Sequence, residues 1–198
     1  RGDLVVANDA ATIPASLAGV HPPTGRAIEV RLARRRSLDS RDVLRFTAIL
    51  FGEGDWRART EDRPAPPPVA IGDTLQLGSM RAIVEGVGVN PRLVELCLEG
   101  EPAAVWRALA EHGRPIQYAY LEAALAMWDV WTPIAAVPAA FEPPSAGFAL
   151  DGRMLAELRA RGVEFATRTH AAGRASTGDA DLDRMLPFDE PYRIPEAT

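Results

Sequence analysis

The sequence contains few histidine or lysine side chains that could transfer a proton or act as a nucleophile. The chain has 22 arginines and no lysine. A guanidinium keeps its charge and cannot form an imine, so lysine Schiff-base chemistry and the lysine of a phosphate-binding P-loop are excluded. Only three histidines occur, His21, His112 and His170. They lie too far apart in sequence to form a short-range metal motif, and we expect no metal cofactor.

The single cysteine, Cys97, excludes an internal disulfide and a cysteine-based zinc site. It lies in a strand-like run, where a small buried side chain is expected. No apolar run approaches the roughly 20 residues that span a bilayer, and residues 1–6 lack the charged and apolar regions of a signal peptide. We therefore expect a cytoplasmic protein. The first residue is Arg1 and not methionine, which indicates a piece of a longer chain, incomplete at both ends.

The formal charge of -5 argues against a surface that binds nucleic acid everywhere, because phosphate neutralisation is the main source of such affinity. Any contact with RNA must then be a local basic patch. The candidate RNA-binding residues are Arg31, Arg34, Arg35 and Arg36. The alternative is a solvated arginine-rich face in a protein that uses no lysine.

Residues 27–100 carry the pattern of short strands. Ile28, Val30 and Leu32 alternate with polar or small residues, which predicts a strand with one buried face. Further strands are predicted at residues 43–51, 74–77, 81–89 and 93–98, the last with Val94, Leu96 and Leu98 inward. Short strands at this spacing, joined without helices, are typical of an antiparallel barrel or sandwich.

The pattern then becomes helical. Residues 102–112 predict a helix with proline in its first turn and Gly113 as a left-handed cap. Asp151 is a predicted N-cap for a helix over residues 152–161 whose apolar face is Met154, Leu155 and Leu158. A strand over residues 163–169 follows, with residues 4–7 as its expected partner.

These elements together predict an α/β domain with an inserted small antiparallel β-barrel domain, an α+β protein overall. The α/β domain comprises residues 1–16 and 114–198. The barrel insertion comprises residues 17–113 and ends in a helix.

Residues 3–17, DLVVANDAATIPASL, resemble a family signature in which a strand ends in Asn-Asp-Thr and a Pro-Ala-Arg-Leu step follows. The family is that of the S-adenosylmethionine:tRNA ribosyltransferase-isomerases of queuosine biosynthesis. Ala10 stands in place of the threonine and Ser16 in place of the arginine. The chain is thus similar to a diverged member.

Two later segments extend the resemblance. Residues 144–147, Pro-Ser-Ala-Gly, are similar to the family's Pro-Thr-Ala-Gly-Leu-His-Phe-Thr motif, although Phe148, Ala149 and Leu150 stand where the motif has Leu-His-Phe. Residues 169–173 are similar to a family loop that carries a histidine, here His170, and the tail with Glu190 and Tyr192 resembles the stretch that follows. Order and spacing support the resemblance more than any single motif does.

The resemblance implies that the ribosyl part of S-adenosylmethionine moves onto an aminomethyl-deazaguanine base in tRNA, with release of adenine and methionine to give epoxyqueuosine. S-adenosylmethionine would be the ribosyl donor and tRNA the partner, with a monomer as the favoured state. The sulfonium acidifies the neighbouring 5′ hydrogens, so a base must remove one of them. The implied catalytic residues are His170 and Asp9. The implied substrate-binding residues are Asn8, Pro144, Ser145, Ala146, Gly147, Thr169, Gly173 and Tyr192.

Each of these assignments has a structural alternative. His170 would simply bond its own loop, Asn8 and Asp9 would form an Asx turn at the end of the first strand, and residues 144–147 would be only a turn. Two other functions also remain open at this point. The altered motif positions are compatible with an S-adenosylmethionine-binding enzyme that acts on a small molecule, or with a non-catalytic RNA-binding relative.

Overall fold

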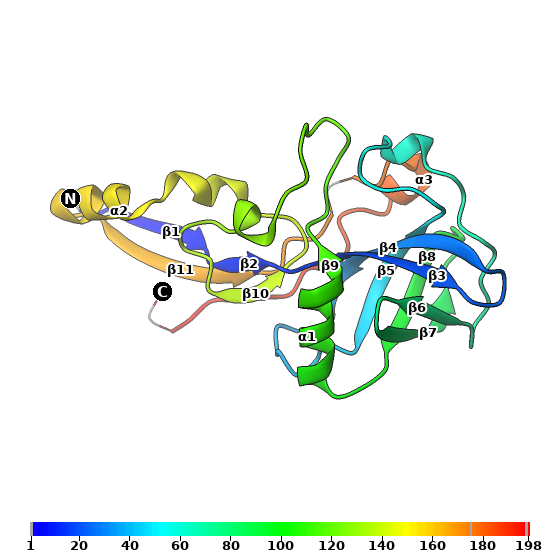
Figure 1. Ribbon diagram of the computed structural model, residues 1–198. Coiled ribbons are helices and arrows are strands. Elements are labelled where there is room, and N and C mark those ends of the chain that lie inside the picture. Colours follow the sequence, from blue (N-terminus) through cyan, green and yellow to red (C-terminus); the bar gives the residue numbers. More distant parts are fainter. Residues whose placement is uncertain (1, 175, 197) are drawn as a thin grey trace.

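The computed structural model describes residues 2–174, 176–196 and 198, so Arg1 lies outside the described residues. Figure 1 shows an elongated molecule with a β-barrel at one end and a smaller layer of strands and helices at the other. The predicted α+β composition is confirmed. In the described part of the chain, no helix has the length and apolar character needed to cross a membrane.

The barrel is built from six antiparallel strands that close on themselves. Around the sheet the order is β4-β5-β8-β7-β6-β3, and β3 pairs back onto β4 to complete the ring. The strands are β3 (Ser16–His21), β4 (Arg26–Arg34), β5 (Arg45–Phe51), β6 (Thr74–Leu77), β7 (Met80–Val87) and β8 (Leu93–Leu98). Val94, Leu96 and Leu98 point into the core as predicted, and Cys97 between them is only half-buried.

Strand β4 departs from the predicted pattern of a single buried face. Glu29 and Arg31 are buried along with Ile28 and Val30, because other parts of the chain cover the outside of the barrel here. Arg63 reaches in from the loop after β5 and forms an ion pair with Glu29, and the Arg31 guanidinium lies over the Phe51 ring. Alternation alone could not reveal this second layer.

Helix α1 (Pro102–His112) has the predicted bounds and packs on the barrel, where Val105 and Leu109 join its hydrophobic core. The prediction for Gly113 is wrong. Its φ of -81° is extended rather than left-handed, because Gly113 begins the short strand β9 (Gly113–Arg114), which pairs with β3. A side chain is excluded there for another reason: a Cβ atom would lie 2.6 Å from the carbonyl oxygens of Leu109 and Pro14.

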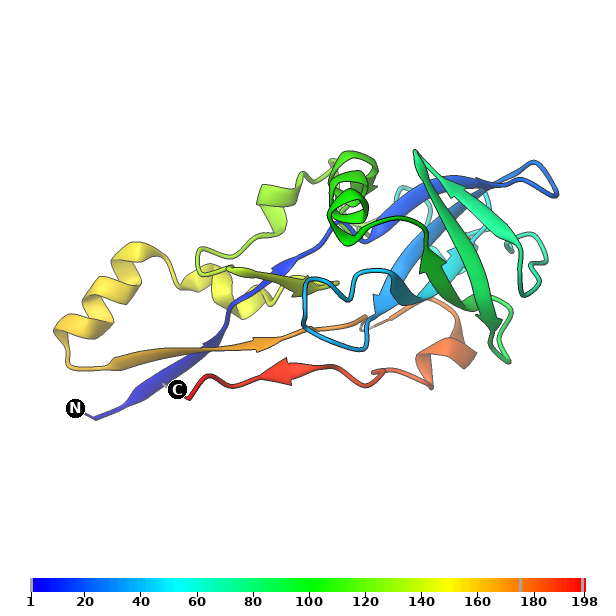
Figure 2. The ribbon, with the colours of Figure 1, turned by 90° about the horizontal axis from the view of Figure 1, so that it is seen from below.

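The smaller layer contains two sheets. Strand β1 (Leu4–Asn8) pairs in parallel with β11 (Glu164–His170), as predicted, and β12 (Tyr192–Arg193) adds antiparallel to the end of β11. Strand β2 (Ala10–Thr12) pairs in parallel with β10 (Val137–Ala140). Figure 2 shows β1 continuing through β2 toward the barrel, with β11 running beside them.

Helix α2 (Gly152–Ala160) begins as predicted, since the Asp151 side chain accepts a hydrogen bond from the Met154 backbone N–H at 2.7 Å. Its predicted apolar face is not buried: Leu155 and Leu158 are half-buried and Met154 is exposed. Helix α2 lies at the outer end of the molecule (Figure 1), where few elements cover it. The remaining elements are η1 (Thr60–Asp62), η2 (Met127–Val130), η3 (Ser145–Ala149) and α3 (Ala180–Asp183).

Candidate functional site

A pocket of about 490 Å³ opens at the end of β1 and β11, where predicted site residues from three parts of the chain meet. Because β1 and β11 are parallel and Asn8 is in register with Arg168, both strands end at the same edge. Ligands commonly bind at the carboxyl ends of parallel strands. The pocket is lined by Val6, Ala7, Asn8, Pro143, Pro144, Ser145, Ala146, Gly147, Leu150, Arg168, His170 and Ala172.

The alternation of side chains along β11 decides which of its residues reach the pocket. Arg168 and His170 are two positions apart and both line it, while Thr169 between them is buried on the other face. The Thr169 hydroxyl donates to the Asp9 carboxylate at 2.7 Å. Asp9 and Thr169 therefore form a pair behind the pocket, and neither side chain lines it.

Asn8 holds the backbone of His170 in place. Its amide nitrogen donates to the His170 carbonyl oxygen at 3.0 Å, and its amide oxygen accepts from the His170 N–H at 2.9 Å. The same oxygen accepts from the Ala10 N–H at 3.1 Å, which is the Asx turn weighed as the structural alternative. Asn8 thus both turns the chain after β1 and ties β1 to the end of β11.

The partner of the His170 side chain is Glu190, a residue that belongs to the family-like tail but was not among the predicted site residues. The His170 Nε2 atom lies 2.7 Å from a Glu190 carboxylate oxygen. The other oxygen accepts from the Gly173 N–H at 2.7 Å. A carboxylate that binds one imidazole nitrogen fixes the orientation and the tautomer of the ring, so the pair is suited to moving a proton through the other nitrogen.

Gly173 therefore lies beside the site, as the support of Glu190. A Cβ atom on Gly173 would come within 3.0 Å of the Glu190 Oε1 atom. Tyr192, in contrast, is 66% exposed and lines a different hollow together with Ser37, Asp39 and Pro138. The structure does not bring the Tyr192 side chain to the pocket.

Residues 144–147 form one wall of the pocket as the beginning of the 3-10 helix η3. Gly147 is buried, and its N–H donates to the Pro144 carbonyl oxygen at 2.9 Å, so this N–H already has a partner. A Cβ atom at Gly147 would lie 3.0 Å from Thr132. The glycine lets this wall pack closely while Ser145 and Ala146 remain exposed.

A tyrosine pair flanks the same wall. The Tyr118 hydroxyl donates to the Glu142 carboxylate, and Glu142 precedes the pocket residue Pro143. Burial raises the pKa of Tyr118 to about 12, with the Glu142 carboxylate adding to the effect and Arg174 opposing it. Tyr120 stacks on Tyr118 with ring centroids 5.8 Å apart. Neither tyrosine lines the His170 pocket, and both line a separate hollow together with residues 59–61.

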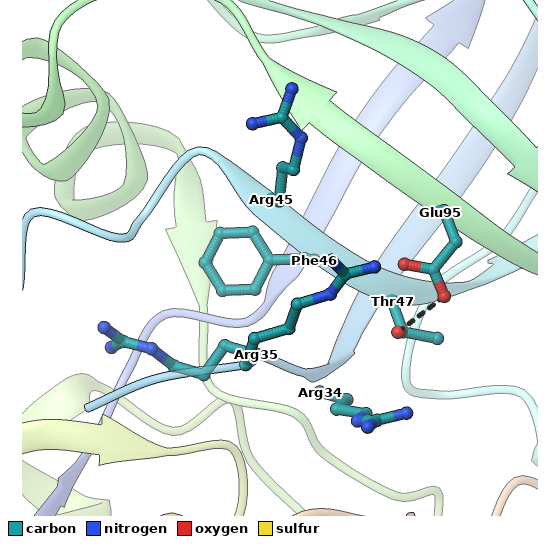
Figure 3. A pocket seen from close by; sticks show the side chains of 7 residues that line it. Arg34, Arg35, Arg45, Phe46, Thr47 and Glu95 are labelled. Carbon is teal, nitrogen blue, oxygen red and sulfur yellow. Dashed lines mark hydrogen bonds between the residues drawn. The ribbon is translucent and has the colours of Figure 1, made fainter. Parts of the chain in front are cut away.

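The predicted arginine patch is only partly on the surface. Arg31 and Arg35 are each 1% exposed, so the prediction that they belong to an exposed patch is wrong. Arg31 pairs with Glu29 inside the outer layer of the barrel, and Arg35 donates to backbone carbonyls of Pro138 and Asp39. Arg34 and Arg36 remain accessible and line a second pocket with Arg45, which Figure 3 shows from close by.

Within the described residues, histidine, cysteine and carboxylate side chains form no group of three or more that could hold a metal ion.

The family model for the queuosine biosynthesis protein matches residues 1–198. The chain belongs to this family.

Individual family members are similar over nearly the whole chain. An S-adenosylmethionine:tRNA ribosyltransferase-isomerase from Thermus thermophilus is 28% identical over 98% of this chain and 53% of its own length. The enzymes of the same name from Burkholderia mallei and Anaeromyxobacter sp. are 31% and 34% identical, over 99% and 82% of this chain and 50% and 43% of their own lengths. The chain spans about half the length of the curated relatives it matches.

Among solved structures, the S-adenosylmethionine tRNA ribosyltransferase from Thermotoga maritima aligns with 87% of this chain and 41% of its own chain. The TM-score is 0.33 and the sequence identity is 18%.

Proposed function

We propose that this family member catalyses the S-adenosylmethionine-dependent tRNA ribosyltransferase-isomerase reaction. In this reaction the ribosyl part of S-adenosylmethionine moves onto a 7-aminomethyl-7-deazaguanine base in tRNA. Adenine and methionine are released, and the product is epoxyqueuosine. Membership of the family supports the proposal.

The observation that carries the proposal is the convergence of the family-like segments on one pocket. Asn8 comes from the first segment, residues 144–147 from the second and His170 from the third, and all of them line the same cavity. Its volume of about 490 Å³ falls within the range of small-molecule sites. The walls combine apolar side chains with a few polar groups, as the binding of a nucleoside with an amino-acid tail requires.

In this proposal His170 is the base that takes a 5′ proton from S-adenosylmethionine, whose sulfonium makes that proton acidic. Glu190 fixes the ring through the 2.7 Å contact with Nε2 and stabilises the imidazolium that forms. Arg168, which lines the pocket beside His170, supplies a fixed positive charge for the carboxylate of the methionine moiety. Asp9 is the alternative base, and its bond with Thr169 makes it the weaker candidate.

The domain arrangement is part of the same proposal. Residues 17–113 would form a barrel inserted between residues 1–16 and 114–198 of an α/β domain. The parallel pairs β1–β11 and β2–β10 join the segments before and after the barrel, which supports this division. We further propose a monomeric cytoplasmic protein that has tRNA as its partner and S-adenosylmethionine as its ribosyl donor, without a metal.

The decisive experiment measures adenine release from S-adenosylmethionine, with and without tRNA that carries the 7-aminomethyl-7-deazaguanine base. We expect release that depends on this tRNA. His170→Ala should lower the rate by about 10²- to 10⁴-fold, the usual contribution of a general base. His112→Ala is the matched control, because His112 is exposed on α1 and bonds only Ser79 and Glu111 among the described residues. Full activity of His170→Ala would exclude His170 as the base.

A further inference from the structure

A second pocket, of about 210 Å³, has an unusual concentration of positive charge in a protein whose net charge is -5. Figure 3 shows Arg35 and Phe46 between Arg45 on one side and Arg34 on the other. The lining residues are Arg34, Arg35, Arg36, Arg45, Phe46, Thr47 and Glu95. Four arginine side chains and one carboxylate thus line the pocket.

A bulge in β4 creates this arrangement. The register of β4 against β5 shifts between Leu32 and Arg34, and the chain leaves the sheet at Arg34. A bulge re-aims the side chains that follow it. Consequently Arg35 turns inward and is buried, while Arg36 remains exposed at the mouth of the pocket.

The positive charge of the pocket is incompletely compensated. The Nε atoms of Arg34 and Arg35 are buried and have no hydrogen-bond partner among the described residues. Arg36 has no ion pair within the part of the chain that the structure describes. Arg34 and Arg45 pair with Asp189 and Glu85, but these pairs are exposed and such pairs are weak. Burial lowers the pKa of Arg35, and Asp42 and Asp39 offset only part of this effect.

The pocket is connected to the His170 site through two consecutive residues. The Arg34 Nη2 atom lies 3.0 Å from the Asp189 carboxylate, and the next residue, Glu190, binds His170. The Ala33 carbonyl oxygen also lies close to Gly173, 3.4 Å from the position of a Cβ atom there. A polymer that placed one unit in the His170 pocket would therefore have its neighbouring backbone near these arginines.

We propose that the arginine pocket binds one backbone phosphodiester of the RNA substrate, next to the nucleotide that enters the His170 pocket. This inference rests on the proposed function for the identity of the RNA. Guanidinium groups bind phosphate oxygens through two parallel hydrogen bonds, and an incoming phosphate replaces the weak pairs of Arg34 and Arg45.

Glu95 makes the pocket specific for RNA. One of its oxygens accepts from the Thr47 hydroxyl at 2.8 Å, a bond drawn in Figure 3. A carboxylate repels phosphate, but it accepts a hydrogen bond from the ribose 2′-hydroxyl, the group that distinguishes RNA from DNA. Glu95 is thus assigned as the acceptor for the 2′-hydroxyl beside the bound phosphodiester.

The test measures binding of an unmodified tRNA transcript by fluorescence anisotropy at several salt concentrations, without S-adenosylmethionine. Arg36→Ala and Arg45→Ala should each raise the Kd about tenfold and reduce the slope of log K against log salt by about 1. Arg81→Ala is the matched control, since Arg81 forms a similar exposed pair with Glu99 on the same barrel. An equal effect of all three substitutions would overturn the pocket assignment. If Arg36→Ala and Arg45→Ala weaken RNA binding and reduce the salt slope as expected, but the wild-type protein releases no adenine, only the proposed function is refuted.

A second measurement compares a short hairpin RNA with its 2′-deoxy counterpart. The wild-type protein should prefer the RNA, and Glu95→Ala should bring the ratio of the two Kd values toward 1. The ratio is the informative quantity, because loss of the Glu95 charge strengthens the binding of both oligonucleotides. A ratio that Glu95→Ala leaves unchanged would overturn the assignment of the 2′-hydroxyl to Glu95.

Discussion

The His170 imidazole and the Glu190 carboxylate are joined by a 2.7 Å contact between Nε2 and Oε2. The second carboxylate oxygen is held by the Gly173 N–H, so Glu190 has a single orientation. The Asn8 side-chain amide fixes the His170 backbone, because it accepts from the His170 N–H and donates to the His170 carbonyl oxygen. Ring and backbone of His170 are therefore positioned by residues far apart in the sequence.

Glu190→Gln should lower the turnover number for adenine release about 10²-fold, because the neutral amide stabilises an imidazolium less well. Binding of S-adenosylmethionine, measured by calorimetry, should change little. The pH profile of kcat should change as well, which a purely structural role would not cause. Glu196→Gln removes an equal charge from the exposed tail and serves as the control. An unaltered pH profile in Glu190→Gln would contradict the role assigned to Glu190.

Asn8→Asp should lower the free energy of unfolding by about 0.5–1.5 kcal/mol, the usual contribution of one hydrogen bond, because the His170 carbonyl oxygen keeps its bond from the Ala172 N–H. Aspartate still accepts from the N–H groups of His170 and Ala10, but it cannot donate to the His170 carbonyl oxygen. Urea unfolding measures the change. Stability equal to the wild type would mean that the donated bond contributes nothing.

Glu29→Gln should destabilise the barrel by about 3–5 kcal/mol, because it leaves the guanidinium groups of Arg31 and Arg63 buried without their carboxylate. Glu99→Gln, in an exposed pair with Arg81, should have little effect. Urea unfolding at neutral pH gives both values. Similar losses in the two variants would argue against a special role for the buried pair.

The same residue makes stability depend on pH. Burial by itself raises the pKa of Glu29, but the charge and hydrogen bonds of Arg31, with further bonds from Arg63 and Ser16, outweigh burial and lower it. A carboxyl whose folded pKa lies below its unfolded value stabilises the protein above the unfolded pKa, about 4.3. That contribution disappears as the pH falls through the folded pKa. The wild type should therefore lose more stability than Glu29→Gln on acidification below about pH 4.

Gly113→Ala should lower the free energy of unfolding by about 1–3 kcal/mol, as overpacking typically does. Its Cβ atom would meet the carbonyl oxygens of Leu109 and Pro14 at 2.6 Å. Gly152→Ala is the matched comparison, since nothing lies within 4 Å of a Cβ atom there and alanine favours the helix. We expect it to be neutral or slightly stabilising in thermal unfolding. A neutral Gly113→Ala would show that the backbone at Leu109 and Pro14 can move away at little cost.

Elements whose causes are local could be predicted from the sequence alone. Helix α1 has the predicted bounds because proline begins it and its apolar positions follow a helical period. Strands β6 and β8 also match, and Asp151 caps α2 through a bond to a residue three positions away. The family-like segments predicted residues that meet in one pocket, since Asn8, residues 144–147 and His170 all line it.

What the sequence could not show depends on contacts between distant segments. Strands β2 and β10 are short and, among the described residues, form a sheet of their own, so neither has a recognisable pattern by itself. Arg31 is buried because Phe51 and Arg63 cover it, and Gly113 is extended because β3 is its neighbour. Glu190 reaches His170 only through the pairing of β11 with β12. Periodicity and capping report the interactions of a residue with its own segment, whereas burial, ion pairing and the shape of a site arise when separate segments pack together.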